Sequence, residues 1–388
     1  MSLISWRTWR QDHRLDEREV DALTWAWRQA CEGAGVCVQV DTPTGTTVST
    51  PHLVEIVLGP PTVLVAKLLP GQLLPDIRRA ALRMAPHLGA IALRVEPVGL
   101  IHVRVELLNA DPLDAFDPLQ LPPAMGSAVL GLAEHGGTLT EDWAEVAHTI
   151  LQGVTRSGKS RWTYGLLAQM AHDQRITVCG CDPTGLLFRP FRGTRHGEWQ
   201  VSGVGDPKAH LLLLGRLVDE MDQRIAALPE DRDTLEVGTD PEHQLRVIVL
   251  EELAGLYRAV DALDKDSGKA IRALISRLLA EGAKVGFRVV IIVQRAEANI
   301  IGSFERAMCS LRISFRTDNQ ASVELLHPGT DKGLADAHTT ARPGIALMSS
   351  PGQELIRFRA PFVAGYADYV QAVRDACADE AGPDALAA

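Results

Sequence analysis

The sequence predicts an α/β protein in which a mostly parallel central sheet carries a phosphate-binding loop, preceded by a small α/β N-terminal domain. Residues 153–160 read Gly-Val-Thr-Arg-Ser-Gly-Lys-Ser and fit Gly-x-x-x-x-Gly-Lys-[Ser/Thr], a pattern that requires a strand before it and a helix after it. Beyond residue 125, apolar runs without polar alternation recur between helical stretches. Such runs are typical of parallel strands that helices cover on both faces.

The N-terminal α/β domain is predicted over residues 1–110. Two helices are expected, at 15–31 and 75–85, and they accompany β-like runs at 54–58, 63–68, 91–95 and 101–107. Residues 111–124 contain several prolines and turn-forming residues, which is the composition of a linker.

The main domain is predicted over residues 125–368. Its strand-like runs lie at 147–151, 176–181, 246–250, 287–293, 311–315 and 344–348. Residues 369–388 are acidic and rich in alanine, and this composition predicts a tail at the C-terminus.

Composition limits the class of protein. With 388 residues the chain has room for two or three domains. No uninterrupted apolar run approaches the roughly 18 residues of a membrane-spanning helix, and the N-terminus lacks the apolar core of a signal peptide. Six cysteines without zinc-type pairs favour reduced thiols and a cytoplasmic protein. The net charge of −10 gives no general attraction to nucleic acid, but it does not exclude a basic surface on one face.

The residue types in the phosphate loop indicate what each position does. Gly153 and Gly158 allow tight turns that direct backbone N–H groups at a β-phosphate. Lys159 supplies a cation to the β- and γ-phosphates, and Ser160 offers a hydroxyl to Mg²⁺ at a helix N-terminus. A plain glycine-rich turn is the alternative interpretation. The predicted nucleotide-binding residues are Gly153, Val154, Thr155, Arg156, Ser157, Gly158, Lys159, Ser160 and Arg161.

Two further strands end in polar side chains that suit nucleotide hydrolysis. The run at 246–250 is followed by Glu251 and Glu252, which we assign to the Mg²⁺ shell and to the general base that activates water. The run at 287–293 is followed by Gln294, whose amide can hydrogen-bond the γ-phosphate or the attacking water. The alternatives are a helix cap or solvated turn for the two carboxylates and a plain strand terminus for Gln294.

Taken in order, these elements resemble the FtsK/SpoIIIE family of ring-shaped DNA translocases, and among them the Tra (TraB-like) proteins of actinomycete conjugative plasmids and related phage translocases. The resemblance covers roughly residues 55–365. It is carried by the segments at 68–71, 148–160, 217–225, 278–295, 312–318 and 342–347. Two positions depart from it: Glu251 stands where the family usually has Asp, and Ala283 stands where many relatives carry Arg.

The resemblance implies a RecA-like P-loop NTPase motor that uses ATP and Mg²⁺. It also implies a homo-hexamer around double-stranded DNA, in which an arginine reaches the γ-phosphate held by a neighbouring subunit. We assign this role to Arg312 in preference to Arg316. Membrane or septal partner proteins are compatible with the resemblance, and they would place a cytoplasmic protein at the membrane periphery.

DNA contact is assigned to a basic loop. Residues 187–199 carry Arg189, Arg192 and Arg195, and a basic loop can follow phosphates without reading sequence. An ordinary solvated loop is the alternative. Asp182 ends the strand before this loop, where a turn-forming role and a functional role are both open.

The predicted function is ATP hydrolysis coupled to translocation of double-stranded DNA, in conjugative plasmid transfer between cells or in phage DNA handling. Two alternatives stay open: an FtsK-type secretion ATPase that moves protein, and a non-motor nucleotide-binding regulatory module. Secretion ATPases usually carry tandem motor domains, whereas this sequence has one phosphate loop. The set of Lys159, Ser160, Glu252 and Gln294 disfavours a non-motor module.

Overall fold

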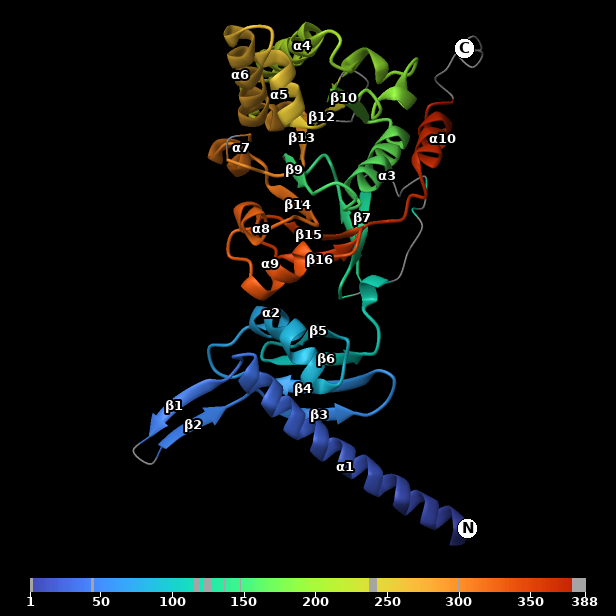
Figure 1. Ribbon diagram of the computed structural model, residues 1–388, viewed down its shortest axis with the longest axis vertical. Coiled ribbons are helices and arrows are strands. Elements are labelled where there is room, and N and C mark those ends of the chain that lie inside the picture. Colours follow the sequence, from blue (N-terminus) through green and yellow to red (C-terminus); the bar gives the residue numbers. More distant parts are fainter. Residues whose placement is uncertain are drawn as a thin grey trace. The chain divides into compact units, whose positions relative to one another are not determined.

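The computed structural model describes residues 3–42, 45–114, 119, 121, 127–135, 137–146, 148–236, 243–298 and 300–378. The chain divides into two compact units, one formed by Met1–Ala115 with Glu134–Gly137 and the other by Phe116–Ala133 with Thr138–Ala388 (Figure 1). The predicted linker at 111–124 lies for the most part outside the described residues. The boundary between the two units falls inside that range.

The first unit is a four-stranded antiparallel sheet packed against helices, with a separate two-stranded hairpin. Its elements are α1 (Leu3–Gly33), β1 (Val38–Thr42), β2 (Gly45–Ser49), β3 (His52–Val57), β4 (Thr62–Lys67), α2 (Leu74–Met84), η1 (Ala85–Leu88), β5 (Ala92–Val98), β6 (His102–Leu108) and η2 (Pro112–Asp114). The sheet order is β3-β4-β6-β5, and β1 pairs with β2. Leu64 and Val105 face each other across the sheet and pack with Trp27, Ile77 and Met84 from the helices.

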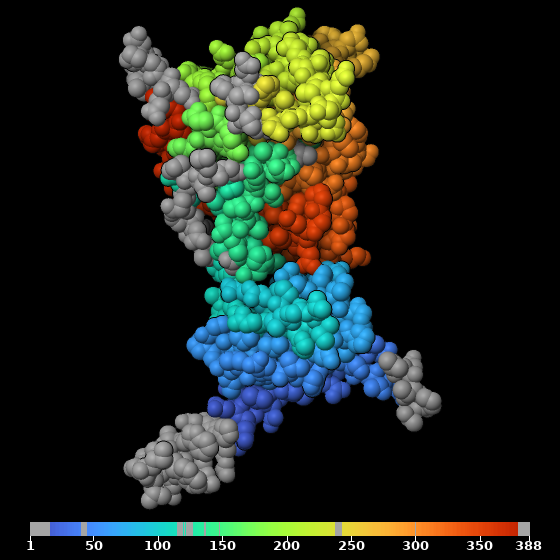
Figure 2. Space-filling model, turned by 180° about the vertical axis from the view of Figure 1, so that it is seen from behind, coloured from blue at the N-terminus to red at the C-terminus, as the bar shows by residue number. Residues whose placement is uncertain are grey.

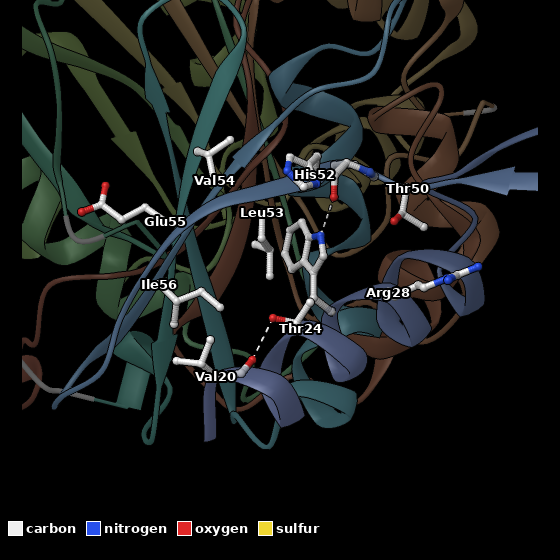
Figure 3. A pocket seen from close by; sticks show the side chains of 11 residues that line it. Val20, Thr24, Arg28, Thr50, His52, Leu53, Val54, Glu55 and Ile56 are labelled. Carbon is white, nitrogen blue, oxygen red and sulfur yellow. Dashed lines mark hydrogen bonds between the residues drawn. The ribbon is translucent and has the colours of Figure 1, made fainter. Parts of the chain in front are cut away.

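An open pocket of about 460 Å³ lies where α1 passes the edge strand β3. Figure 3 shows Thr24 on the helix side of this pocket and Ile56 on the strand side. The indole Nε1 of Trp27 donates a hydrogen bond to the Pro51 carbonyl at 2.7 Å. The pocket is therefore part of the packing between the helix and the strand.

The second unit is built on a ten-stranded sheet. Its strands are β7 (Ala128–Ala133), β8 (Thr138–Glu141), β9 (Thr149–Gln152), β10 (Ile176–Asp182), β11 (Gln200–Ser202), β12 (Leu245–Leu250), β13 (Phe287–Val293), β14 (Leu311–Phe315), β15 (Ile345–Ser349) and β16 (Ile356–Arg359). Their order is β11-β10-β12-β13-β9-β14-β15-β16-β7-β8 (Figure 1). The pairings from β11 to β14 are parallel, and the others are antiparallel. The predicted α/β class with a mostly parallel sheet is confirmed.

One predicted strand, at 344–348, differs in direction from its neighbours. β15 pairs antiparallel with both β14 and β16. Its residues from Ile345 to Met348 are buried, as they would be in a parallel strand. Because burial on both faces looks the same in either direction, the apolar run did not indicate its orientation.

Helices cover both faces of the sheet. They are α3 (Lys159–His172), α4 (Pro207–Ala226), α5 (Leu253–Asp261), α6 (Lys265–Glu281), α7 (Ser303–Met308), α8 (Gln320–Leu326), α9 (Lys332–Thr339) and α10 (Tyr366–Ala376). Val247 and Val249 of β12 belong to one core with Trp162 of α3, whereas Ile248 and Leu250 belong to the other with α4, α5 and α6. Within the described residues, no helix is both long and apolar enough to cross a membrane.

Helix α10 corrects the first part of the tail predicted at 369–388. Tyr369 and Val373 are buried in the core beside α3, and the Tyr369 ring stacks on Tyr164 with centroids 4.6 Å apart. The two buried residues are four apart and so share one helix face, a spacing that the acidic, alanine-rich composition obscured. Residues 379–388 of the predicted tail lie outside the described residues.

Candidate active site

The phosphate loop at 153–160 connects β9 to α3, as its pattern predicts. Close contacts with neighbouring atoms require both of its glycines. A Cβ at Gly153 would lie 2.8 Å from the Phe315 Cβ. One at Gly158, where φ is +106°, would lie 2.5 Å from the Gly344 backbone nitrogen. A side chain at either position would force the loop or its neighbours to shift.

Neighbouring segments hold the loop in place. The Val154 N–H donates to the Arg316 carbonyl at 3.0 Å, and the Gly344 N–H donates to the Ser157 carbonyl at 2.8 Å. Both partners come from the part of the chain around β14 and β15. The loop shape is therefore set by the fold itself, which is the condition for a preorganised anion site.

Lys159 begins α3, and its side chain is buried. Its ammonium donates to the Val293 carbonyl at 2.9 Å, at the end of β13. Burial lowers the pKa of Lys159, while the carboxylates of Glu251 and Glu252 act in the opposite direction. The lysine thus lies within electrostatic reach of both acids that the sequence assigns to the same site.

Glu251 and Glu252 directly follow β12. The Glu251 N–H donates to the Cys181 carbonyl at 2.9 Å. Burial raises the pKa of the Glu251 carboxyl to about 7, and the Lys159 ammonium acts in the opposite direction. Glu252 has a left-handed backbone with φ +45°, a conformation that costs a non-glycine residue about 1–2 kcal/mol. The chain therefore holds the second acid in a strained turn at the start of α5.

One cavity of about 780 Å³ joins these groups. It is lined by residues 153–162, by Glu251, Glu252 and Gln294, and by the segments 342–344 and 359–363. Gln294 Nε2 donates to Glu252 Oε2 at 3.4 Å. Because β9, β12 and β13 are parallel, their carboxyl ends meet at one edge of the sheet, where ligands of such folds bind.

Comparison with known proteins agrees with this geometry. Residues 120–246 match the FtsK/SpoIIIE family. DNA translocase FtsK of Campylobacter jejuni is 22% identical over 285 residues, which cover 70% of this chain and 28% of that protein. This part of the chain is similar to FtsK/SpoIIIE proteins. DNA translocase FtsK of Vibrio vulnificus is 25% identical over 304 residues, covering 66% of this chain and 30% of its own length. The chain thus spans less than a third of these curated FtsK proteins.

Two solved structures share the fold of this chain. The pCW3 conjugation coupling protein TcpA, in its monomer form with ATPγS, has a TM-score of 0.56 and 18% identity, covering 88% of this chain and 95% of that chain. The cytoplasmic domain of the type VII secretion ATPase EccC of Thermomonospora curvata has a TM-score of 0.51 and 22% identity, covering 69% and 33%. Both support an α/β P-loop fold for the second unit.

Arg312, which the sequence assigned to the γ-phosphate of a neighbouring subunit, donates hydrogen bonds within its own chain. From β14 its guanidinium donates to the backbone carbonyls of Cys309 at 3.1 Å, Leu326 at 3.2 Å and Arg306 at 2.7 Å. These bonds use three of the five N–H donors of the guanidinium, and the assignment of Arg312 to a neighbouring subunit's γ-phosphate stays a prediction. The alternative, Arg316, is half-buried and donates to the Ala341 carbonyl at 3.4 Å.

The three arginines of the predicted basic loop differ in their exposure. Arg195 is half-buried, and its Nη2 donates to the carbonyls of Ala171 and Asp173 at 3.2 Å, where α3 ends. Burial lowers the pKa of Arg195. Its role is therefore structural, which corrects its assignment to DNA. Arg189 and Arg192 are exposed.

Two tyrosines of α10 hold the chain just before the exposed arginines. The Tyr366 hydroxyl donates to the Leu186 carbonyl and the Tyr369 hydroxyl to the Leu187 carbonyl, each at 2.7 Å. Figures 1 and 2 show this helix, in red, against the green segment that carries the loop. Asp182 accepts the Leu187 N–H at 2.7 Å, which supports the turn-forming interpretation of that residue.

A buried hydrogen-bond network, absent from the sequence prediction, fixes the backbone beyond Gln294. Gln152 ends β9, and its Oε1 accepts the Ala296 N–H at 3.1 Å. Its Nε2 donates to Ser314 Oγ at 2.6 Å, and this hydroxyl also bonds His327 Nε2 at 2.9 Å. A polar residue at the end of an apolar strand was the available signal, because a buried amide must find partners.

We expect Gln152→Leu to lower the free energy of unfolding by about 2–4 kcal/mol, because the Ala296 N–H and the Ser314 hydroxyl lose a buried partner. Nucleotide affinity should fall as well, since the backbone after Gln294 is released. Gln169→Leu is the matched control, because Gln169 is equally buried and accepts the Val129 N–H at 2.7 Å far along α3. Urea unfolding and ATPγS titration check both variants. Equal affinity in the two would contradict a positioning role for Gln152.

Proposed function

We propose that this chain is an ATPase that uses hydrolysis to move double-stranded DNA, in conjugative plasmid transfer or in phage DNA handling. The proposal is carried by the convergence of Lys159, Glu251, Glu252 and Gln294 in one cavity beside the phosphate loop. Kinship with DNA translocase FtsK supports DNA as the substrate. The conjugative setting is suggested by the fold shared with the conjugation coupling protein TcpA.

In this proposal the phosphate loop and Lys159 bind the nucleotide. The loop N–H groups and Lys159 hold the β- and γ-phosphates. Ser160 and Glu251 line the same cavity and supply a hydroxyl and a carboxylate, the oxygen donors that suit Mg²⁺. The raised pKa of Glu251 fits this role, because an adjacent divalent cation would stabilise the charged carboxylate. When bound, Mg²⁺ neutralises charge on the phosphates.

Hydrolysis requires a base and a group that senses the terminal phosphate. Glu252 is the general base that takes a proton from the attacking water. Gln294 lines the same cavity and donates to the Glu252 carboxylate at 3.4 Å, a contact that helps to orient it. In this proposal, the residue that reports the γ-phosphate is hydrogen-bonded to the residue that activates water.

DNA contact and assembly complete the proposal. Arg189 and Arg192 contact DNA phosphates from their exposed positions. The chain acts as a homo-hexamer around the duplex, with membrane or septal proteins as further partners. Ser160 and Arg161 are exposed at the cavity rim, which leaves the nucleotide accessible to an arginine of a neighbouring subunit.

DNA-stimulated ATP hydrolysis tests this function. Duplex DNA should raise the hydrolysis rate, and displacement of a triplex-forming strand should show movement along the duplex. Stimulation by a secreted polypeptide instead would favour a secretion ATPase, the alternative that shares its fold with EccC. Nucleotide binding without stimulation by either polymer would favour a non-motor module.

We expect Arg189→Gln combined with Arg192→Gln to weaken duplex binding and to reduce the slope of log affinity against log salt concentration by about 2, because each arginine neutralises about one phosphate. Fluorescence anisotropy at several salt concentrations measures the slope. The control combines Arg232→Gln with Lys269→Gln, which removes two exposed cations elsewhere on the same unit. A slope that changes equally in both double variants would reject the loop as the DNA contact.

A further inference from the structure

The phosphate loop contains a turn whose backbone suits glycine but carries an arginine. The Ser157 N–H donates to the Val154 carbonyl at 3.2 Å, which closes a four-residue turn with Thr155 and Arg156 at its centre. Arg156 has φ +62°, whereas Thr155 does not have a positive φ. A positive φ at the third position alone is the pattern of a type II turn, which favours glycine or asparagine there.

Packing does not account for the arginine. The Arg156 side chain is exposed, and it makes no hydrogen bond or ion pair with any residue that the structure describes. In the same described part of the chain, the one other non-glycine residue with a positive φ is Glu252. Both residues line the nucleotide cavity. Residues held in sparsely populated backbone regions cluster at functional sites, and Glu252 is the general base proposed above.

Other basic side chains of the cavity wall are already engaged. Lys159 and Arg359 donate to backbone carbonyls at 2.9 Å and 3.2 Å. Arg161 lies over the Phe362 ring, 6.0 Å from its centroid. Arg156 therefore brings to the phosphate loop a guanidinium that has no partner among the residues the structure describes.

We propose that the Arg156 side chain is a second phosphate-binding cation of this loop, in addition to Lys159. The inference rests on the proposed function, because it requires that the cavity bind a nucleoside triphosphate. A planar guanidinium can grip two phosphate oxygens at once, whereas an ammonium acts as a point charge. The free-energy cost of the left-handed backbone at Arg156 is then offset by ligand binding and not by contacts within the folded protein. Arg156 should therefore lower the stability of the ligand-free protein and raise its affinity for nucleotide.

Two substitutions remove the charge and keep a residue that tolerates the left-handed backbone. Arg156→Asn should raise the thermal midpoint of unfolding of the ligand-free protein and weaken ATPγS binding by on the order of tenfold. Arg156→Gly should weaken binding equally, although its greater freedom in the unfolded chain reduces the gain in stability. Arg156→Lys retains a cation and should keep part of the affinity. Titration with ATPγS and with ADP, together with thermal unfolding, measures these effects in the full chain.

Each outcome decides the inference. A loss of affinity for ATPγS alone places Arg156 on the terminal phosphate, and an equal loss for ADP places it on phosphates that both nucleotides share; either result supports the proposal. Wild-type affinity for both nucleotides in Arg156→Asn and Arg156→Gly overturns it. If Lys159→Ala then still abolishes binding, the proposed function stands without this inference. If the wild-type chain binds no ATPγS, the proposed function itself fails.

Discussion

Lys159→Ala should abolish ATP hydrolysis, with a fall in kcat/KM on the order of a thousandfold. The ammonium is buried on the wall of the cavity, where a charge interacts with phosphate far more strongly than in water. Alanine also leaves the Val293 carbonyl without its donor. The fold should tolerate the change, because burial already lowers the pKa of Lys159 and so disfavours its charged form.

Steady-state hydrolysis with and without duplex DNA measures this effect, and ATPγS titration shows whether binding is lost with it. Lys159→Met serves as a second variant, because it fills most of the side-chain volume without the charge. Thermal unfolding of both variants verifies that they are folded. DNA-stimulated hydrolysis at the wild-type rate in either variant would remove the basis of the motor proposal.

Glu252→Gln should bind ATPγS with wild-type affinity while its hydrolysis rate falls on the order of 10²–10⁴-fold, the usual contribution of a general base. Glutamine has the same shape and can still accept the hydrogen bond from Gln294, so the geometry of the site is kept. What is lost is the ability to take a proton from water. The effect therefore falls on kcat and leaves affinity unchanged.

Glu251→Gln is the matched control for the second acid, since the two residues are adjacent and both line the cavity. If Glu251 contributes to the Mg²⁺ shell, its substitution should raise the Mg²⁺ concentration needed for half-maximal hydrolysis. ATPase assays over a range of Mg²⁺ concentrations separate the two effects. Loss of hydrolysis with unchanged Mg²⁺ dependence in Glu251→Gln, and an active Glu252→Gln, would exchange the two assigned roles.

The parts of the site that the sequence could place share one property: each directly follows a strand. The phosphate loop, Glu251 with Glu252, and Gln294 come after β9, β12 and β13. Parallel strands end at the same edge of a sheet, so fold class and local sequence together were sufficient to bring these residues into one cavity. The same rule applies to Asp182, which ends β10 and begins a turn.

The parts that the sequence could not place depend on contacts between distant segments. Arg312 and Arg195 look like available cations in sequence, but their partners are backbone carbonyls of other elements, which no residue pattern reveals. The network around Gln152 joins residues more than 140 positions apart. The antiparallel direction of β15 could not be predicted for a related reason, because the direction of a strand depends on the path of the whole chain.

The stacked rings of Tyr164 and Tyr369 connect the two proposed ligand sites by a short path. Tyr164 lies on α3, four residues after Ser160, and the Tyr369 hydroxyl holds the Leu187 carbonyl just before the exposed arginines. Two ligands that bias one shared element have coupled binding free energies, and such coupling is reciprocal. If nucleotide binding raises the affinity for DNA by a given factor through this path, DNA binding must raise the affinity for nucleotide by the same factor.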